Sequence, residues 1–148
     1  MGKTALCEGR GEIMTRLPDV SVGYAVIAIG GEFVSTPKAY TALDSHFSDF
    51  DGSVSTGGER KYTILKSALE KGALDADGLF NVFEVAVLPE CPKATAIKQE
   101  LLEFGARAAM MSGSGPSVFG LFDTLAKAEF AANVLLQKGY SAFVVHSV

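Results

Sequence analysis

Short apolar runs, bounded by glycine, proline and polar residues, recur along the chain and predict strands. The clearest, residues 24–29 (YAVIAI), has glycine on either side and the length of a buried strand rather than a helix. A mixed segment at residues 12–17 precedes it and ends at a proline. Three further strands are expected at residues 107–111, 117–122 and 140–145.

Apolar residues at helical spacing predict helices between these strands. Thr36 and Pro37 give a start signal, with threonine as the N-cap and proline at the first helical position, for a helix to about Leu43. The other helices are expected at residues 60–71, 79–88, 92–104 and 125–138. Each has one apolar stripe, and the four stripes in chain order are Tyr62, Leu65 and Leu69; Phe80, Phe83 and Val87; Ile97, Leu101 and Phe104; and Leu125, Ala128, Ala132 and Leu135. Residues 45–59 are rich in serine, glycine and aspartate, so they predict a surface loop.

The order β-β-α-α-α-α-β-β-α-β does not alternate strictly between strand and helix. It favours an α+β fold over a parallel α/β fold. We expect a two-layer domain spanning residues 1–148, with a mainly antiparallel sheet and helices packed on one face.

Composition excludes a disordered or nucleic-acid-binding chain. Hydrophobic residues make up 48% and charged residues 20% of the sequence, and the formal net charge is −4. Counted with glycine and without tyrosine, apolar residues make up about 56% of the chain, against a typical 45–50%. This excess suggests that some apolar surface is covered by a partner outside the chain, as in a homodimer formed through an exposed apolar face.

The expected compartment is the cytoplasm. Cys7 and Cys91 are far apart without metal-binding spacing, which is typical of reduced thiols in a cytosolic protein. No apolar run approaches the roughly 18 residues that a membrane span needs, and the N-terminus has no signal-peptide core. His46 and His146 lack partners at metal spacing, so no metal site is expected in this chain.

The most informative stretch is the glycine-rich loop at residues 112–116 (SGSGP), which connects two predicted strands. Glycines flanking a serine allow backbone N–H groups to converge on a phosphate. The alternative is a tight strand connection in which glycine supplies a positive φ. The sequence contains neither a P-loop nor a dinucleotide-binding fingerprint.

Several motifs together resemble the GHMP kinase superfamily. The run SGSGPSVFGLF resembles its third motif, while GRGE at residues 9–12 and VSTPKAY at residues 34–40 resemble the branch that phosphorylates 4-diphosphocytidyl-2-C-methyl-D-erythritol. Asn81-x-x-Glu84, on a predicted helix, continues the match, which covers nearly the whole chain in order.

The resemblance implies the ferredoxin-like carboxy-terminal domain of such a kinase. The family's ATP-cradling motif and its catalytic lysine and aspartate lie in an amino-terminal half and do not occur in this sequence. The resemblance therefore implies no catalytic residue in this chain, inactivity of the chain alone, and ATP and Mg²⁺ as cofactors of the intact enzyme. The substrate would be a CDP-linked sugar alcohol used in isoprenoid biosynthesis.

The same resemblance assigns substrate-binding roles to residues in two segments. Tyr40 would stack on the cytosine ring, and Thr36 and Pro37 would shape the wall beside it. In the glycine-rich loop, Gly113, Ser114 and Gly115 would approach the diphosphate or the reacting hydroxyl with backbone donors.

For each of these assignments a plainer interpretation stays open. Tyr40 could be a core residue on a helix face. Asn81 and Glu84 could support a neighbouring loop by hydrogen bonds, or could be an exposed polar pair. At the level of the whole chain, the alternatives are a domain of another GHMP kinase and a free-standing module that binds a small molecule or dimerises.

Overall fold

The computed structural model describes residues 4–47 and 58–147. Its strands are β1 (Ala5–Glu8), β2 (Ile13–Arg16), β3 (Tyr24–Ile29), β4 (Ala108–Met111), β5 (Val118–Phe122) and β6 (Ser141–His146). Its helices are α1 (Thr36–Phe47), α2 (Gly58–Glu70), α3 (Glu84–Val87), α4 (Pro92–Glu103) and α5 (Leu125–Gln137). Two 3₁₀ helices cover Ala76–Gly78 and Leu88–Glu90.

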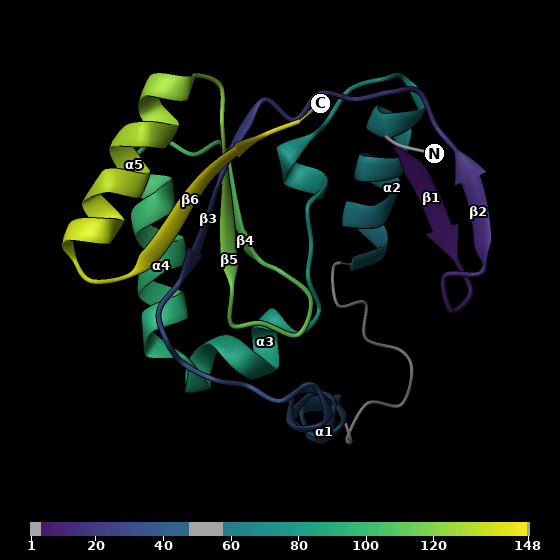
Figure 1. Ribbon diagram of the computed structural model, residues 1–148. Coiled ribbons are helices and arrows are strands. Elements are labelled where there is room, and N and C mark those ends of the chain that lie inside the picture. Colours follow the sequence, from purple (N-terminus) through teal and green to yellow (C-terminus); the bar gives the residue numbers. More distant parts are fainter. Residues whose placement is uncertain (1–3, 48–57, 148) are drawn as a thin grey trace.

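Four strands form one sheet in the order β4-β5-β3-β6, and every neighbouring pair is antiparallel. The chain path from β3 through α4, β4, β5 and α5 to β6 is the βαββαβ path of ferredoxin-like folds. Helices α4 and α5 cover one face of this sheet (Figure 1). The expected α+β fold, with a mainly antiparallel sheet and helices on one face, is confirmed.

The core lies between that sheet face and helices α4 and α5. Alternation along each strand points one set of side chains toward the helices, and these include Val26, Val118 and Phe122, all fully buried. Ile97 and Leu101 on α4 meet them, as the helical spacing predicts. Leu125, expected on the buried face of α5, is instead 43% exposed, because it begins the helix directly after its N-cap Thr124.

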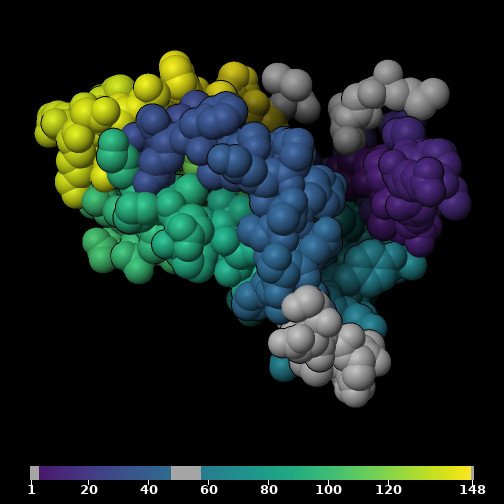
Figure 2. All heavy atoms as spheres, turned by 90° about the horizontal axis from the view of Figure 1, so that it is seen from below, coloured from purple at the N-terminus to yellow at the C-terminus, as the bar shows by residue number. Residues whose placement is uncertain are grey.

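The amino-terminal hairpin forms a separate two-stranded sheet. Strand β1 pairs only with β2 in the described part of the chain, and neither strand holds a buried residue. Met14 is 66% exposed. An isolated two-stranded hairpin is marginally stable in water, so these strands offer apolar surface and free edges to a neighbour. Figure 2 shows the hairpin at one end of the molecule and β6 at the other.

Strand β1, the end of helix α1 and the extent of the surface loop differ from the sequence-based expectations. Strand β1 was not expected, because its apolar pattern is too short to stand out. Helix α1 continues to Phe47 instead of ending near Leu43. Residues 45–47 and 58–59 of the predicted surface loop are therefore helical, and residues 48–57 lie outside the described residues.

The prediction of a helix at residues 79–88 is wrong for the first half of that range. Helix α3 begins only at Glu84, because the Asn81 side chain accepts a hydrogen bond from the Phe83 backbone amide at 3.0 Å. Such a local turn competes with the helix. Phe80, expected on a helix face, is consequently 41% exposed.

Helix α2 has the predicted length but no buried face. Leu65 and Leu69 are only half-buried, and Tyr62, on the same predicted stripe, is 46% exposed. Its main described neighbour is the 3₁₀ helix Ala76–Gly78, where Gly78 is so close to Leu65 that a β carbon would overlap its backbone. The apolar stripe of α2 therefore stays partly open to solvent.

Candidate functional site

Three segments that are distant in sequence meet at one end of the four-stranded sheet. They are the first turn of α1, the turn leading into α3, and the glycine-rich loop between β4 and β5 (Figure 1). All three carry residues that the sequence predicts for the site.

The first turn of α1 contacts the glycine-rich loop directly. The hydroxyl oxygens of Thr36 and Ser114 lie 3.1 Å apart, although 78 residues separate them. The sequence predicts Thr36 as the N-cap of the helix, and that prediction is wrong. Ser35 accepts the hydrogen bond of the Lys38 amide instead, at 3.4 Å, which leaves the Thr36 hydroxyl available to Ser114.

Asn81 holds the glycine-rich loop from the side of α3. Its amide nitrogen donates to the carbonyl oxygens of Met111, at 2.7 Å, and Gly113, at 2.8 Å. Its own carbonyl oxygen accepts from Phe83, so both ends of the side chain are used. The position of the loop relative to α3 is fixed by these bonds.

Glu84 joins the same loop to helix α4. One carboxylate oxygen accepts the Met111 backbone N–H at 2.8 Å, and the other lies 2.7 Å from the Lys98 ammonium. The side chains of Glu84 and Lys98 are only 19% and 26% exposed. A charge-assisted bond in such a position is stronger than an exposed ion pair.

Gly115 has a backbone conformation that a larger residue would not tolerate. Its φ is +77°, and a β carbon would overlap the side chain of Met111, which is fully buried. The Gly115 amide donates to the Ser112 carbonyl at 3.0 Å and closes the turn. Within the described residues, the amides of Gly113 and Ser114 have no acceptor, so they are available to a ligand.

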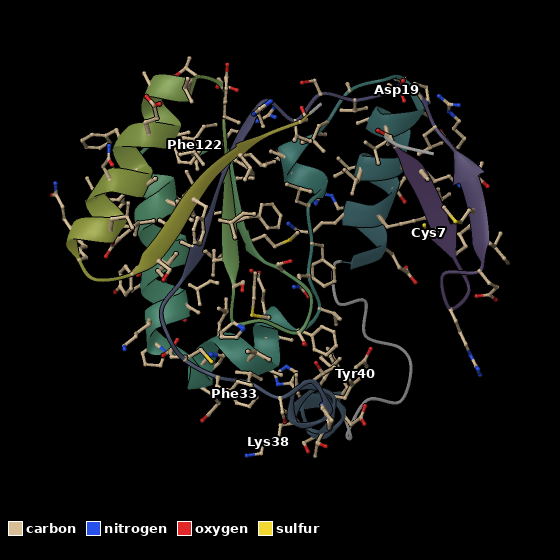
Figure 3. The ribbon with its side chains drawn as sticks, in the orientation of Figure 1. Cys7, Asp19, Phe33, Lys38, Tyr40 and Phe122 are labelled. Carbon is tan, nitrogen blue, oxygen red and sulfur yellow. The ribbon has the colours of Figure 1, made fainter. Side chains whose placement is uncertain are left out.

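Tyr40 lies on α1 beside this loop, and the residue is 54% exposed. The rings of Tyr40 and Phe83 are in T-shaped contact, with their centroids 4.9 Å apart and an interplanar angle of 90°. Figure 3 shows Tyr40 on the inner side of α1 and Lys38 pointing outward. The alternative that Tyr40 is a core residue is not met, because about half of the residue is open to solvent.

Pro37 is also exposed, next to Thr36 in the first turn. The structure thus brings Thr36, Pro37 and Tyr40 on α1 to one side of the loop that carries Gly113, Ser114 and Gly115. Met111 is the residue that sequence reasoning missed here. Its backbone binds both Asn81 and Glu84, and only the register of β4 could have indicated it.

Glu84, the acidic side chain that binds the Met111 backbone, is already paired with Lys98. Burial raises the pKa of the Cys91 thiol, and the nearby carboxylates of Glu32 and Glu90 raise it further. The thiol is therefore protonated at neutral pH.

In residues 4–47 and 58–147, no group of three or more histidine, cysteine or acidic side chains could bind a metal ion. No helix of the described chain has the length and apolar character to cross a membrane.

The family model described as "GHMP kinases C terminal" matches residues 60–142. A curated relative from Acaryochloris marina, named "4-diphosphocytidyl-2-C-methyl-D-erythritol kinase", is 39% identical and aligns with 90% of this chain and 46% of its own length. A relative of the same name from Lachnospira eligens is 38% identical, over 94% of this chain and 46% of its own. The chain spans about half the length of the curated relatives it matches.

Solved structures of kinases with the same fold superpose on this chain. A "4-(cytidine 5'-diphospho)-2C-methyl-D-erythritol kinase" superposes with a TM-score of 0.68 and 25% identity, covering 96% of this chain and 48% of its own. A homoserine kinase from Cytophaga hutchinsonii, at 20% identity and a TM-score of 0.69, shares the fold. The resemblance inferred from the motifs is confirmed, and the chain belongs to the family of GHMP kinase carboxy-terminal domains.

Proposed function

We propose that this chain is the substrate-side domain of an ATP-dependent kinase that phosphorylates the 2-hydroxyl of 4-diphosphocytidyl-2-C-methyl-D-erythritol. Two of its relatives carry the name of that kinase. The observation that carries the proposal is the exposure of Tyr40, next to a loop that hydrogen bonds hold against α1 and the turn leading into α3.

Each part of the site has a role in this proposal. The open face of Tyr40 stacks on the cytosine ring, a contact worth roughly 1–3 kcal/mol. Thr36 and Pro37 form the wall beside the base. The amides of Gly113 and Ser114, with Gly115 keeping side chains away, donate to the diphosphate or the reacting hydroxyl.

The phosphoryl-transfer step is assigned to groups outside this chain. The glycine-rich loop contains no lysine or arginine, and the described residues offer no acidic cluster for Mg²⁺. Positioning and charge stabilisation drive phosphoryl transfer, and this chain contributes mainly to positioning. The proposal therefore includes an amino-terminal domain that binds ATP and Mg²⁺, with residues 1–148 as the carboxy-terminal domain. The open apolar surfaces of the β1–β2 hairpin and α2 support such a neighbour.

The chain alone is expected to release no ADP in response to the CDP-linked substrate. Adding the amino-terminal half of a curated relative, as a separate polypeptide or by fusion, should restore substrate-dependent release. A coupled ADP assay measures both. Turnover by the purified chain alone, above the rate of the buffer blank, would overturn the assignment of the chemistry to the missing half.

Cytidine diphosphate should bind weakly to the chain and perturb a defined set of amides. A titration followed by amide chemical shifts is expected to move Thr36, Lys38 and Tyr40 together with Gly113 and Ser114. ADP at the same concentrations serves as the control, because it has the diphosphate but another base. If these amides stay still while another face responds, the substrate site lies elsewhere.

A free-standing module that dimerises or binds another small molecule is the competing proposal. Cytidine-dependent shifts around Tyr40 favour the kinase domain, whereas a stable dimer without any cytidine response favours the module. Cytidine dependence in the reconstituted enzyme also separates this kinase from other members of the superfamily.

A further inference from the structure

The two edge strands of the four-stranded sheet, β4 and β6, differ in whether their outward backbone groups have partners. At the β4 edge, the outward N–H and C=O groups of Met111 bind the side chains of Glu84 and Asn81. The sheet therefore cannot be extended by another strand at Met111. The β6 edge lies on the opposite side, away from α2 and the hairpin (Figure 1).

Strand β6 directs a regular row of backbone groups away from the sheet. The Ser147 amide donates to the Gly23 carbonyl at 3.2 Å, in the register of the β3–β6 pairing. The N–H and C=O groups of Ser147, Val145 and Phe143 therefore point toward β3. Since an antiparallel ladder uses alternate residues, Ala142, Val144 and His146 point their N–H and C=O groups outward. No partner for these groups is found among the described residues.

The sequence of this edge has none of the features that protect exposed strands. The segment SAFVVH contains no lysine, proline or acidic residue. On the face away from the helices, Phe143 is 59% and Val145 39% exposed, and Ile27 beside Phe143 is 36% exposed. A groove of about 400 Å³ runs between β6 and α5, where Leu136 is 49% exposed.

We propose that β6 pairs with β6 of a second copy of this chain, antiparallel about a two-fold axis at Val144, so that two four-stranded sheets become one sheet. The outward groups are self-complementary in this register. Val144 lies opposite Val144 of the partner subunit, and Ala142 lies opposite His146 of the partner subunit. Three outward donors and three outward acceptors on each strand then all find partners, giving six hydrogen bonds.

Side chains support the same register. Phe143 lies opposite Val145 of the partner subunit, which is an aromatic–β-branched pair of the kind that stabilises sheets. The pair occurs twice because of the symmetry. Strand β6 contains no lysine, arginine or acidic residue, so no pair of such side chains meets across the axis. Any other symmetric register leaves outward groups of Ala142 or His146 without a strand partner.

The register makes a matched pair of double variants decisive. Phe143→Lys with Val145→Lys places two like-charged pairs across the axis, whereas Phe143→Glu with Val145→Lys places two opposite-charged pairs there. Both variants change the same exposed positions and lose the same apolar side chains. Sedimentation equilibrium of the 148-residue chain and of both variants measures the dimer dissociation constant, and far-UV circular dichroism checks the fold.

The wild-type chain should be dimeric. The dissociation constant of the lysine–lysine variant should exceed that of the glutamate–lysine variant by about ten-fold or more. Val144→Pro, which removes an outward donor but no β3–β6 bond, should give a monomer. A monomeric wild-type chain would overturn the proposal, as would equal dissociation constants for the two charge variants. Association through the open surfaces of α2 or the hairpin would not distinguish those variants.

Discussion

Replacing Glu84 with alanine is expected to lower the free energy of unfolding of the chain by about 2–3 kcal/mol. The substitution removes the acceptor of the Met111 N–H and leaves the ammonium group of Lys98, whose side chain is 26% exposed, without its counter-ion. Unfolding in urea, followed by circular dichroism, measures the change. The slope of the transition should stay constant if only the folded state is affected.

Two variants serve as controls for this experiment. Glu84→Gln keeps an oxygen that can accept from Met111 but loses the charge opposite Lys98, so it should fall between the wild type and Glu84→Ala. Glu103→Ala removes an exposed glutamate from α4 and should change stability by less than about 0.5 kcal/mol. A Glu84→Ala protein as stable as the Glu103→Ala protein would show that the Glu84 contacts contribute nothing to stability.

Replacing Tyr40 with alanine is expected to raise KM for the cytidine-linked substrate by about 5- to 150-fold in a protein that carries both halves of the enzyme. This range is the fold-change that corresponds to roughly 1–3 kcal/mol of stacking energy. The value of kcat should change little, because the base is remote from the transferred phosphoryl group and contributes equally in the ground and transition states. Steady-state kinetics with varied substrate concentrations separates the two constants.

Tyr40→Phe keeps the flat ring and should leave KM nearly unchanged. Phe130→Ala removes an aromatic residue of similar exposure, 56% against 54%, from α5 and controls for the loss of an exposed aromatic side chain. A kcat that falls while KM stays constant would instead place Tyr40 in the transition-state machinery. No effect on either constant would leave the Tyr40 ring without a role in substrate binding.

Most of the fold could be predicted from hydrophobic periodicity. The four strands of the main sheet and helices α2, α4 and α5 lie close to their predicted positions, because each has a strong local pattern. The misplaced start of α3 has a different origin. Phe80, Phe83 and Val87 have helical spacing, yet the Asn81 side chain binds backbone groups of Phe83, Met111 and Gly113 instead of allowing a helical turn.

The residues of the candidate site could be identified from the sequence, but their mutual arrangement could not. The glycine-rich loop and the Thr36–Tyr40 run are recognisable as motifs. Nothing local indicates that Ser35 rather than Thr36 caps α1, or that the Thr36 hydroxyl consequently meets Ser114. A long-range hydrogen bond depends on where two segments lie in space, and no periodicity reports that.

The sequence by itself determined which segments become strands and helices, and that one face of the main sheet is apolar, since these follow from the spacing of side chains along the backbone. Only the tertiary structure decided which apolar faces are covered. The stripes on α4 and α2 look alike in sequence, but Ile97 on α4 is fully buried against the sheet, whereas α2 has no buried residue. Burial depends on how much of a second surface of the same chain is within reach. The main described neighbour of α2 is only the short 3₁₀ helix Ala76–Gly78, and no further strand pairs with the β1–β2 hairpin or with the outer edge of β6 among the described residues.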